Sequence, residues 1–336
     1  MSSPVQIAIH PSQFPGAVRR ELLESLRSRK VNHKFHYDSV KQTQKWLALH
    51  EAYSPARTDP DCAATYDAGF IAAAERIGPA RVHLIALGCG GGQKDARLLQ
   101  LLRQNGKQIA CTISDVSVAM VLVGRDGILG AVPGAECHLL VCDLATAADL
   151  PEVLAPPIHP DATRLVTFFG MIPNFEPQVI LPRLAALLRP ADYLLVSANL
   201  APGPDYADGV RRMLPLYDNE LTREWLLTFL LDLGVERGNG DLGIAVEDTA
   251  GGLKRIVADF RFTRPRQIRV GDETFDFPTG DAIRLFFSYR HTPELIRSQL
   301  GAHGMKVLDQ WITKSGDEGI FICQRDQQGA SSIRPP

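Results

Sequence analysis

Closely spaced glycines follow a buried-looking segment of this chain, in a pattern that suits binding of a nucleotide. Residues 82–87 are five-sixths apolar, and Gly88 and the glycine run 90–92 come directly after them. An amphipathic segment follows, with apolar Ala96, Leu98 and Leu99 among charged neighbours. A strand, a glycine-rich turn and a helix let the backbone approach a nucleotide, and the helix start offers free N–H groups. A tight turn packed against its own helix is the alternative interpretation, because no further glycine completes the dinucleotide fingerprint.

Acidic residues end the next two apolar segments. Asp115 lies 23 residues after Gly92, at the end of segment 108–115, and Asp143 ends segment 138–143. An acid about 20 residues after the glycines is placed to bind ribose hydroxyls. Acids at the carboxyl ends of neighbouring parallel strands meet above the sheet, where ligands bind. Each acid alone could instead start a loop or cap a helix, but their common register with the glycines favours a ligand site.

The elements that position these residues are predicted as alternating strands and helices. Amphipathic helices separate the apolar segments, which indicates right-handed βαβ units in one parallel sheet. After the fifth strand the pattern changes to loops, one helix at 221–233 and short alternating stretches typical of an α+β element. It resumes with a helix capped by Thr292 and Pro293 and with a closing hairpin. The predicted strands of the large sheet are 82–87, 108–115, 138–143, 164–169, 192–199, 306–313 and 319–323.

Composition excludes several classes of protein. The 336 residues are 45% hydrophobic and 22% charged, with a net charge of −2, so no basic patch indicates nucleic acid or an anionic membrane surface. No apolar run approaches the roughly 18 residues of a membrane span, and the start lacks the pattern of a secretory signal. Six scattered cysteines form no Cys-x-x-Cys pair. We therefore expect a cytoplasmic, reduced protein that acts on a small molecule and uses neither disulfides nor zinc.

Unusual side chains gather between residues 31 and 60. His33 and His36 are three residues apart, but no acidic or cysteine partner at ligand spacing accompanies them, so no metal site is predicted. Tyr37, Asp38, Tyr53 and Arg57 form a mixed polar and aromatic group, which is typical either of a pocket wall or of an interface.

Several motifs in sequence order resemble one family. The glycine turn, the acids and the closing hairpin look like a class I S-adenosylmethionine (SAM)-dependent methyltransferase. A closer resemblance is to the histidine-specific N-methyltransferases of ergothioneine biosynthesis and their dimethylallyltryptophan N-methyltransferase relatives. The motifs that carry it are Phe35-His-Tyr-Asp38, Tyr53-Ser-Pro-Ala-Arg57, Leu87-Gly-Cys-Gly-Gly-Gly-Gln-Lys94, Asp115-Val-Ser117, Phe168-Phe-Gly-Met-Ile-Pro-Asn-Phe-Glu-Pro177, Leu216-Tyr-Asp-Asn219 and Ile283-Arg-x-x-x-Ser288.

The resemblance implies an α/β fold with two domains. A Rossmann-like, mostly parallel sheet with an antiparallel last strand would comprise 63–200 and 286–325 and bind SAM. A smaller α+β substrate-binding domain would comprise 1–62 and 201–285, and 326–336 would be a disordered tail. The residues expected to contact SAM, or its product S-adenosylhomocysteine (SAH), are Gly88, Cys89, Gly90, Lys94, Asp115, Val116, Asp143, Leu144 and Phe169.

The resemblance also implies a substrate site, but this chain differs from the family pattern at one of its positions. Tyr37 and Asn174 would have the catalytic, positioning roles, and the substrate-binding set would be Tyr37, Tyr53, Asn174, Tyr217, Phe286 and Ser288. Histidine-specific members carry Glu two residues before that serine, whereas this chain has Phe286. An imidazole N–H facing Phe286 would lose a hydrogen bond, which costs about 1–3 kcal/mol.

We therefore expect N-methylation of the amino group of an amino acid or related small amine, other than histidine. A natural-product methyltransferase acting on a peptide or hydroxyl group is one alternative. A non-catalytic SAM-binding protein is another, and an NAD-dependent oxidoreductase is a third. Composition and motifs leave the acceptor, the number of methyl groups and the oligomeric state open.

Overall fold

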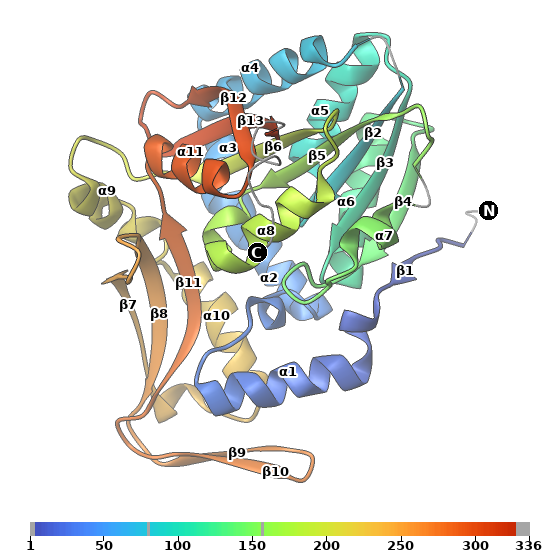
Figure 1. Ribbon diagram of the computed structural model, residues 1–336. Helices are drawn as coiled ribbons and strands as arrows, with labels where there is room; N and C mark the ends of the chain where they lie inside the picture. Colours follow the sequence, from blue (N-terminus) through green and yellow to red (C-terminus); the bar gives the residue numbers. More distant parts are fainter. Residues whose placement is uncertain (1–3, 79–80, 156–157, 327–336) are drawn as a thin grey trace, which may run out of the picture.

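The chain folds around one large sheet (Figure 1). A computed structural model describes residues 4–78, 81–155 and 158–326. The large sheet has eight strands in the order β1-β4-β3-β2-β5-β6-β13-β12, and β13 runs antiparallel to both its neighbours. The strands are β1 (Ala8–Ile9), β2 (Val82–Leu87), β3 (Ile109–Asp115), β4 (Glu136–Val141), β5 (Thr163–Phe169), β6 (Tyr193–Asn199), β12 (Met305–Ile312) and β13 (Glu318–Arg325).

Helices cover both faces of this sheet, which explains why strands such as β2 are buried along their whole length. Apolar side chains of α4, α5 and α6 form one core with one face, and those of α7, α8 and α11 form a second core with the other. The helices are α4 (Pro60–Arg76), α5 (Gln93–Gln104), α6 (Val118–Ala131), α7 (Leu150–Leu154), α8 (Pro177–Leu187) and α11 (Pro293–Ala302).

A smaller sheet lies beside the large one and is shown at the lower left of Figure 1. It has the order β11-β8-β7 and shares a third core with the N-terminal segment and α10. The chain around Val31 runs along the free edge of β11, where Val31 N–H donates to the carbonyl of Arg284 over 2.8 Å. The helices of this part are α1 (Pro15–Ser28), η2 (His33–His36), α2 (Val40–Tyr53), η4 (Leu214–Leu216) and α10 (Glu220–Asp232), and the strands of the small sheet are β7 (Gly240–Asp248), β8 (Lys254–Phe262) and β11 (Ala282–Arg290). Between β8 and β11, β9 (Arg266–Val270) and β10 (Glu273–Phe277) pair with each other as a separate two-stranded sheet.

The predicted fold class, a mostly parallel α/β sheet with an antiparallel last strand, is confirmed. Thr292 caps α11 by accepting a hydrogen bond from Leu295 N–H, with Pro293 at the first helical position, as expected. In the part of the chain that the structure describes, no helix combines the length and the apolar character that a bilayer crossing needs.

The structure differs from the expected domain limits at two places. β11 continues through Phe286 to Arg290 and pairs with β8 along its length, so residues 286–290 belong to the small sheet. β1 pairs with β4, which places residues 8–9 at the edge of the large sheet. We therefore keep the two-domain division as a proposal, with the late boundary moved to the end of β11. The expected disordered tail lies, from residue 327 on, outside the described residues.

Candidate active site

A cavity of about 1030 Å³ opens at the carboxyl ends of β2 to β5 and extends to α2, α10 and β11. All the residues expected to contact SAM or the substrate line it. They are Tyr37, Tyr53, Gly88, Cys89, Gly90, Lys94, Asp115, Val116, Asp143, Leu144, Phe169, Asn174, Tyr217, Phe286 and Ser288. Tyr53, which is 41% exposed at the end of α2, lies at the edge of this site.

The glycine turn owes its shape to conformations that other residues rarely adopt. Gly88 and Gly90 have φ of +68° and +50°. A Cβ on Gly90 would lie 2.9 Å from the Trp46 ring, so the turn also lacks space for a side chain. Gly90 N–H donates to the Asp115 carboxylate over 3.2 Å, which ties the turn to the end of β3.

Asp115 holds a carboxylate at the cavity wall. Its second oxygen accepts from Ser117 N–H over 3.3 Å. Burial raises the pKa of Asp115 to about 6, although the N–H donors act in the opposite direction. The carboxylate is therefore charged near pH 7 and becomes neutral in mildly acidic solution.

Asp143 offers one carboxylate oxygen that has no hydrogen-bond partner in the protein. Its Oδ1 accepts from Ala145 N–H over 2.8 Å, whereas the buried Oδ2 accepts no hydrogen bond. The Lys34 ammonium lies 3.6 Å from this Oδ2 and 3.3 Å from Glu21. A buried acceptor of this kind, in the wall of a cavity, suits a ligand that brings an N–H or O–H group. Sequence analysis did not identify Lys34.

Lys94, which is half-buried, begins a chain of hydrogen bonds that leads into the protein. Its ammonium donates to the Tyr66 hydroxyl over 2.6 Å, and that hydroxyl donates to Glu318 over 2.5 Å. Glu318 begins β13, is 5% exposed, and has its pKa raised by burial. Tyr66 and Glu318 were missed, because no motif links them to the glycine turn in the sequence.

Aromatic rings form the wall farther from the glycine turn. The Phe286 ring stacks on His33 at 5.0 Å between centroids and lies 5.8 Å from Trp225 and 6.0 Å from Tyr217. Tyr37 lies 5.4 Å from Trp225. Burial raises the pKa of Tyr37 well above its usual value, so its phenol stays neutral at physiological pH. Burial also lowers the pKa of His33 to about 3, so this ring is neutral too.

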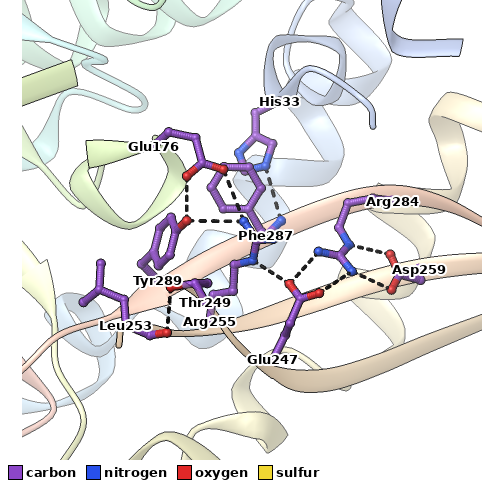
Figure 2. Close-up of polar contacts among 10 residues, drawn as sticks. All are labelled: His33, Glu176, Glu247, Thr249, Leu253, Arg255, Asp259, Arg284, Phe287 and Tyr289. Carbon is purple, nitrogen blue, oxygen red and sulfur yellow. Dashed lines mark hydrogen bonds and ion pairs between the residues drawn. The ribbon is translucent and has the colours of Figure 1, made fainter. Parts of the chain in front are cut away.

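Asn174 ends the short helix η3 (Ile172–Asn174) and lines the cavity. The loop that contains η3 is connected to the small sheet by polar contacts. Figure 2 shows that Glu176 receives hydrogen bonds from Arg255 and Tyr289, at 3.2 and 2.6 Å. Arg255 also donates to Glu247, which pairs with Arg284 farther along the sheet. The loop that presents Asn174 is therefore held by side chains of the small sheet.

A third polar group joins Tyr217, Ser288 and Arg290. The hydroxyls of Tyr217 and Ser288 are 2.9 Å apart, and Arg290 Nη2 donates to Tyr217 over 2.8 Å. In the described ranges, no three His, Cys, Asp or Glu side chains gather in a way that could hold a metal ion. The site thus offers hydrogen-bonding and apolar surfaces.

Residues 18–215 match the model of a family described as histidine-specific methyltransferase, SAM-dependent. The chain belongs to this family. The N-methyltransferase imqF of Aspergillus flavus is 26% identical over 262 residues, which cover 74% of this chain and 69% of imqF. The predicted family, a SAM-dependent methyltransferase, is confirmed.

Two solved methyltransferases resemble the chain more distantly. Magnesium protoporphyrin IX methyltransferase from Synechocystis PCC 6803, with bound SAH, has a TM-score of 0.47 at 14% identity, covering 87% of this chain and 97% of that chain. The mitomycin 7-O-methyltransferase MmcR has a TM-score of 0.44 at 15% identity, covering 94% of this chain and 69% of that chain.

The cavity of this SAM-dependent methyltransferase suits its cofactor by size and by the chemistry of its wall. Its volume of about 1030 Å³ is at the upper end of the usual range of about 300–1,000 Å³ for small-molecule sites. The turn at Gly88 and Gly90 permits close approach of a ligand, and Asp143 supplies a carboxylate oxygen that accepts no hydrogen bond from the protein, although the Lys34 ammonium lies 3.6 Å from it. Since the family is an enzyme family that uses SAM, the interpretations as a sensor protein and as an NAD-dependent oxidoreductase are set aside.

Proposed function

We propose that this methyltransferase modifies the amino group of an amino acid or related small amine, and that it favours an apolar or aromatic side chain over imidazole. The observation that supports the proposal is the environment of Phe286. The ring is 6% exposed and is surrounded by His33, Tyr217 and Trp225. Aromatic rings favour flat or apolar groups and leave an imidazole N–H unpaired.

We assign the cofactor-binding roles by chemistry. Asp115 would accept hydrogen bonds from ribose hydroxyls, and Asp143 would accept one from an amino group. The Lys94 ammonium would face a carboxylate. The turn at Gly88, Cys89 and Gly90 lies between these groups, with Val116, Leu144 and Phe169 as further apolar wall.

Bound SAM supplies an electrophilic methyl group on a sulfonium, and the protein must bring a neutral amine into line with it. We assign this positioning to Tyr37 and Asn174, which line the same cavity. Because its raised pKa keeps Tyr37 a phenol, it holds the amine by a hydrogen bond and does not take its proton. The rings of Tyr37, Trp225 and Phe286 lie close together and give this part of the wall an apolar surface. Tyr217 and Ser288 would hold the rest of the acceptor.

Mass spectrometry of amino-acid and amine mixtures, incubated with the protein and SAM, tests this proposal. We expect a product heavier by one or more methyl groups, with the added mass on nitrogen. N-methylation is also the activity in the name of imqF. Methylation only of hydroxyl compounds or peptides in parallel mixtures would contradict the proposal.

A further inference from the structure

Lys34 is a buried lysine in the cavity wall, and it comes from the N-terminal segment and not from the large sheet. Its exposure is 3%. Its ammonium lies 3.3 Å from the Glu21 carboxylate in α1 and 3.6 Å from the Asp143 carboxylate, which follows β4. Taking a charged side chain out of water is costly, so a buried lysine needs carboxylates close to its ammonium.

The local structure of the N-terminal segment fixes the position of Lys34. Asn32 begins η2 by accepting a hydrogen bond from Lys34 N–H over 3.1 Å. The Asn32 side chain also donates to Glu21, and Asn32 N–H donates to the Ser25 hydroxyl in α1 over 3.1 Å. These bonds join η2 to α1 and hold the ammonium between the two carboxylates.

The cluster of Glu21, Lys34 and Asp143 contains one positive group and two negative groups. Burial raises the pKa of Glu21 and the neighbouring Asp143 raises it further, whereas Lys34 lowers it. Two carboxylates that share a site cannot both keep their charge easily, unless a cation lies beside them. Lys34 therefore allows Asp143 to act as a charged acceptor in the cavity wall.

The order of the strands indicates which part of SAM would meet Asp143. In the large sheet β4 lies next to β3, which lies next to β2. The glycine turn and Lys94 follow β2, Asp115 ends β3, and Asp143 follows β4. With the SAM carboxylate at Lys94 and the ribose hydroxyls at Asp115, the adenine would lie on the side of Asp143. Its 6-amino group is then the donor to this carboxylate.

We propose that Lys34 is a positioning residue of the cofactor site. Together with Glu21 it holds the Asp143 carboxylate as a charged acceptor, and this makes the site selective for adenine over purines that lack the 6-amino group. The inference rests on the cofactor assignment made with the proposed function, and it adds the N-terminal segment to that site. It does not depend on which amine is methylated.

The first test uses the unmodified protein. Calorimetry compares SAH with its 6-deamino analogue, in which hydrogen replaces the amino group of adenine. We expect SAH to bind about tenfold to a hundredfold more tightly, because the analogue leaves the carboxylate without its donor. Equal affinities would remove the amino group from Asp143 and overturn the inference together with this part of the cofactor assignment, while methylation of an amine is measured separately.

The second test removes the ammonium. In Lys34→Met the advantage of SAH over the 6-deamino analogue should fall to within about threefold, since one of the two carboxylates then takes up a proton. Lys34→Arg keeps the charge and should retain part of the advantage. Lys41→Met is the matched control, because Lys41 pairs with Asp232 at the surface, and it should bind both ligands as the unmodified protein does.

A double substitution separates the charge of Lys34 from its packing. Lys34→Met combined with Glu21→Gln removes one charge of each sign, so Asp143 no longer competes with a second carboxylate. We expect this variant to recover much of the advantage of SAH, and to fold even if Lys34→Met alone does not. A full advantage in Lys34→Met would overturn the inference and leave the assignment of Asp143 in place. An equal loss of affinity for both ligands, without recovery in the double variant, would reduce Lys34 to a structural role and overturn the inference as well.

Discussion

At the scale of single residues, Asp115 is the most direct test of the cofactor assignment. Asp115→Ala removes a charged acceptor of the ribose hydroxyls, which is worth about 1.5–3 kcal/mol, or a tenfold to hundredfold loss of affinity. Calorimetry with SAH at pH 8 measures this loss. Unchanged affinity in the variant would remove Asp115 from the site.

The raised pKa of Asp115 adds a pH dependence to the same prediction. Its carboxyl titrates at about 6 in the folded protein, compared with 3.8 ordinarily. As the pH falls through 6, the group gains a proton and ceases to be an anionic acceptor, so SAH affinity should fall between pH 7 and pH 5. Asp115→Asn, which cannot titrate, should have lower affinity at pH 7 but lack this step. A step that persists in Asp115→Asn would assign it to another group.

Phe286 carries the prediction on specificity. Phe286→Glu restores the residue type of histidine-specific relatives and should raise the ratio of histidine to tryptophan use at least about tenfold, since the imidazole N–H gains a partner. The same change places an unpaired carboxylate among aromatic rings, so we expect a loss of about 3–5 kcal/mol of stability. Kinetics with both amino acids and a denaturant titration measure these effects. Phe286→Leu is the apolar control and should leave histidine a poor acceptor.

At the scale of elements, the contacts of the loop at Asn174 predict a long-range effect. Arg255→Gln removes the hydrogen bond to Glu176, two residues after Asn174, and should lower kcat/KM for the acceptor about threefold to tenfold through misplacement. SAH affinity should stay within twofold of the unmodified protein. Arg284→Gln is the control, since Arg284 bonds to Glu247 and Asp259 but not to Glu176. Equal losses in both variants would mean that the small sheet is merely destabilised.

Elements with a long and regular hydrophobic pattern were predicted from the sequence, whereas short or irregular elements were not. Strands such as β2 and β5 were identified because helices on both faces make them continuously apolar. β1 has two residues and exposed side chains, so it carries no pattern of its own. The irregular register between Arg284 and Phe286 likewise depends on the partner strand β8, and sequence alternation could not reveal it.

The candidate site follows the same rule. The glycine turn and Asp115 are local signals in the sequence, and both line the cavity. Lys34 meets Asp143, and Tyr66 meets Glu318, only through the fold, because the residues of each pair lie far apart in the chain. Residues that meet through tertiary contacts have no characteristic separation in the sequence, so sequence analysis could not identify these pairs.

At the scale of the whole molecule, ligand binding should stabilise both parts of the chain together, since the cavity lies between them. SAH at a hundred times its Kd should add about 2.7 kcal/mol of stability, which for a chain of 336 residues raises Tm by roughly 3–5 °C. Differential scanning fluorimetry measures the shift, with NAD as the control that should give none. A shift with NAD but not with SAH would contradict the cofactor assignment.

The central claim is that this family member methylates the amino group of an amino acid other than histidine. The measurement that tests it most directly is the initial rate of SAH formation by the unmodified protein with tryptophan, tyrosine, phenylalanine, leucine and histidine, with N-methylated products identified by mass spectrometry. The environment of Phe286 predicts that at least one of the first four is used with a higher kcat/KM than histidine. Histidine as the best acceptor of the five would contradict the account.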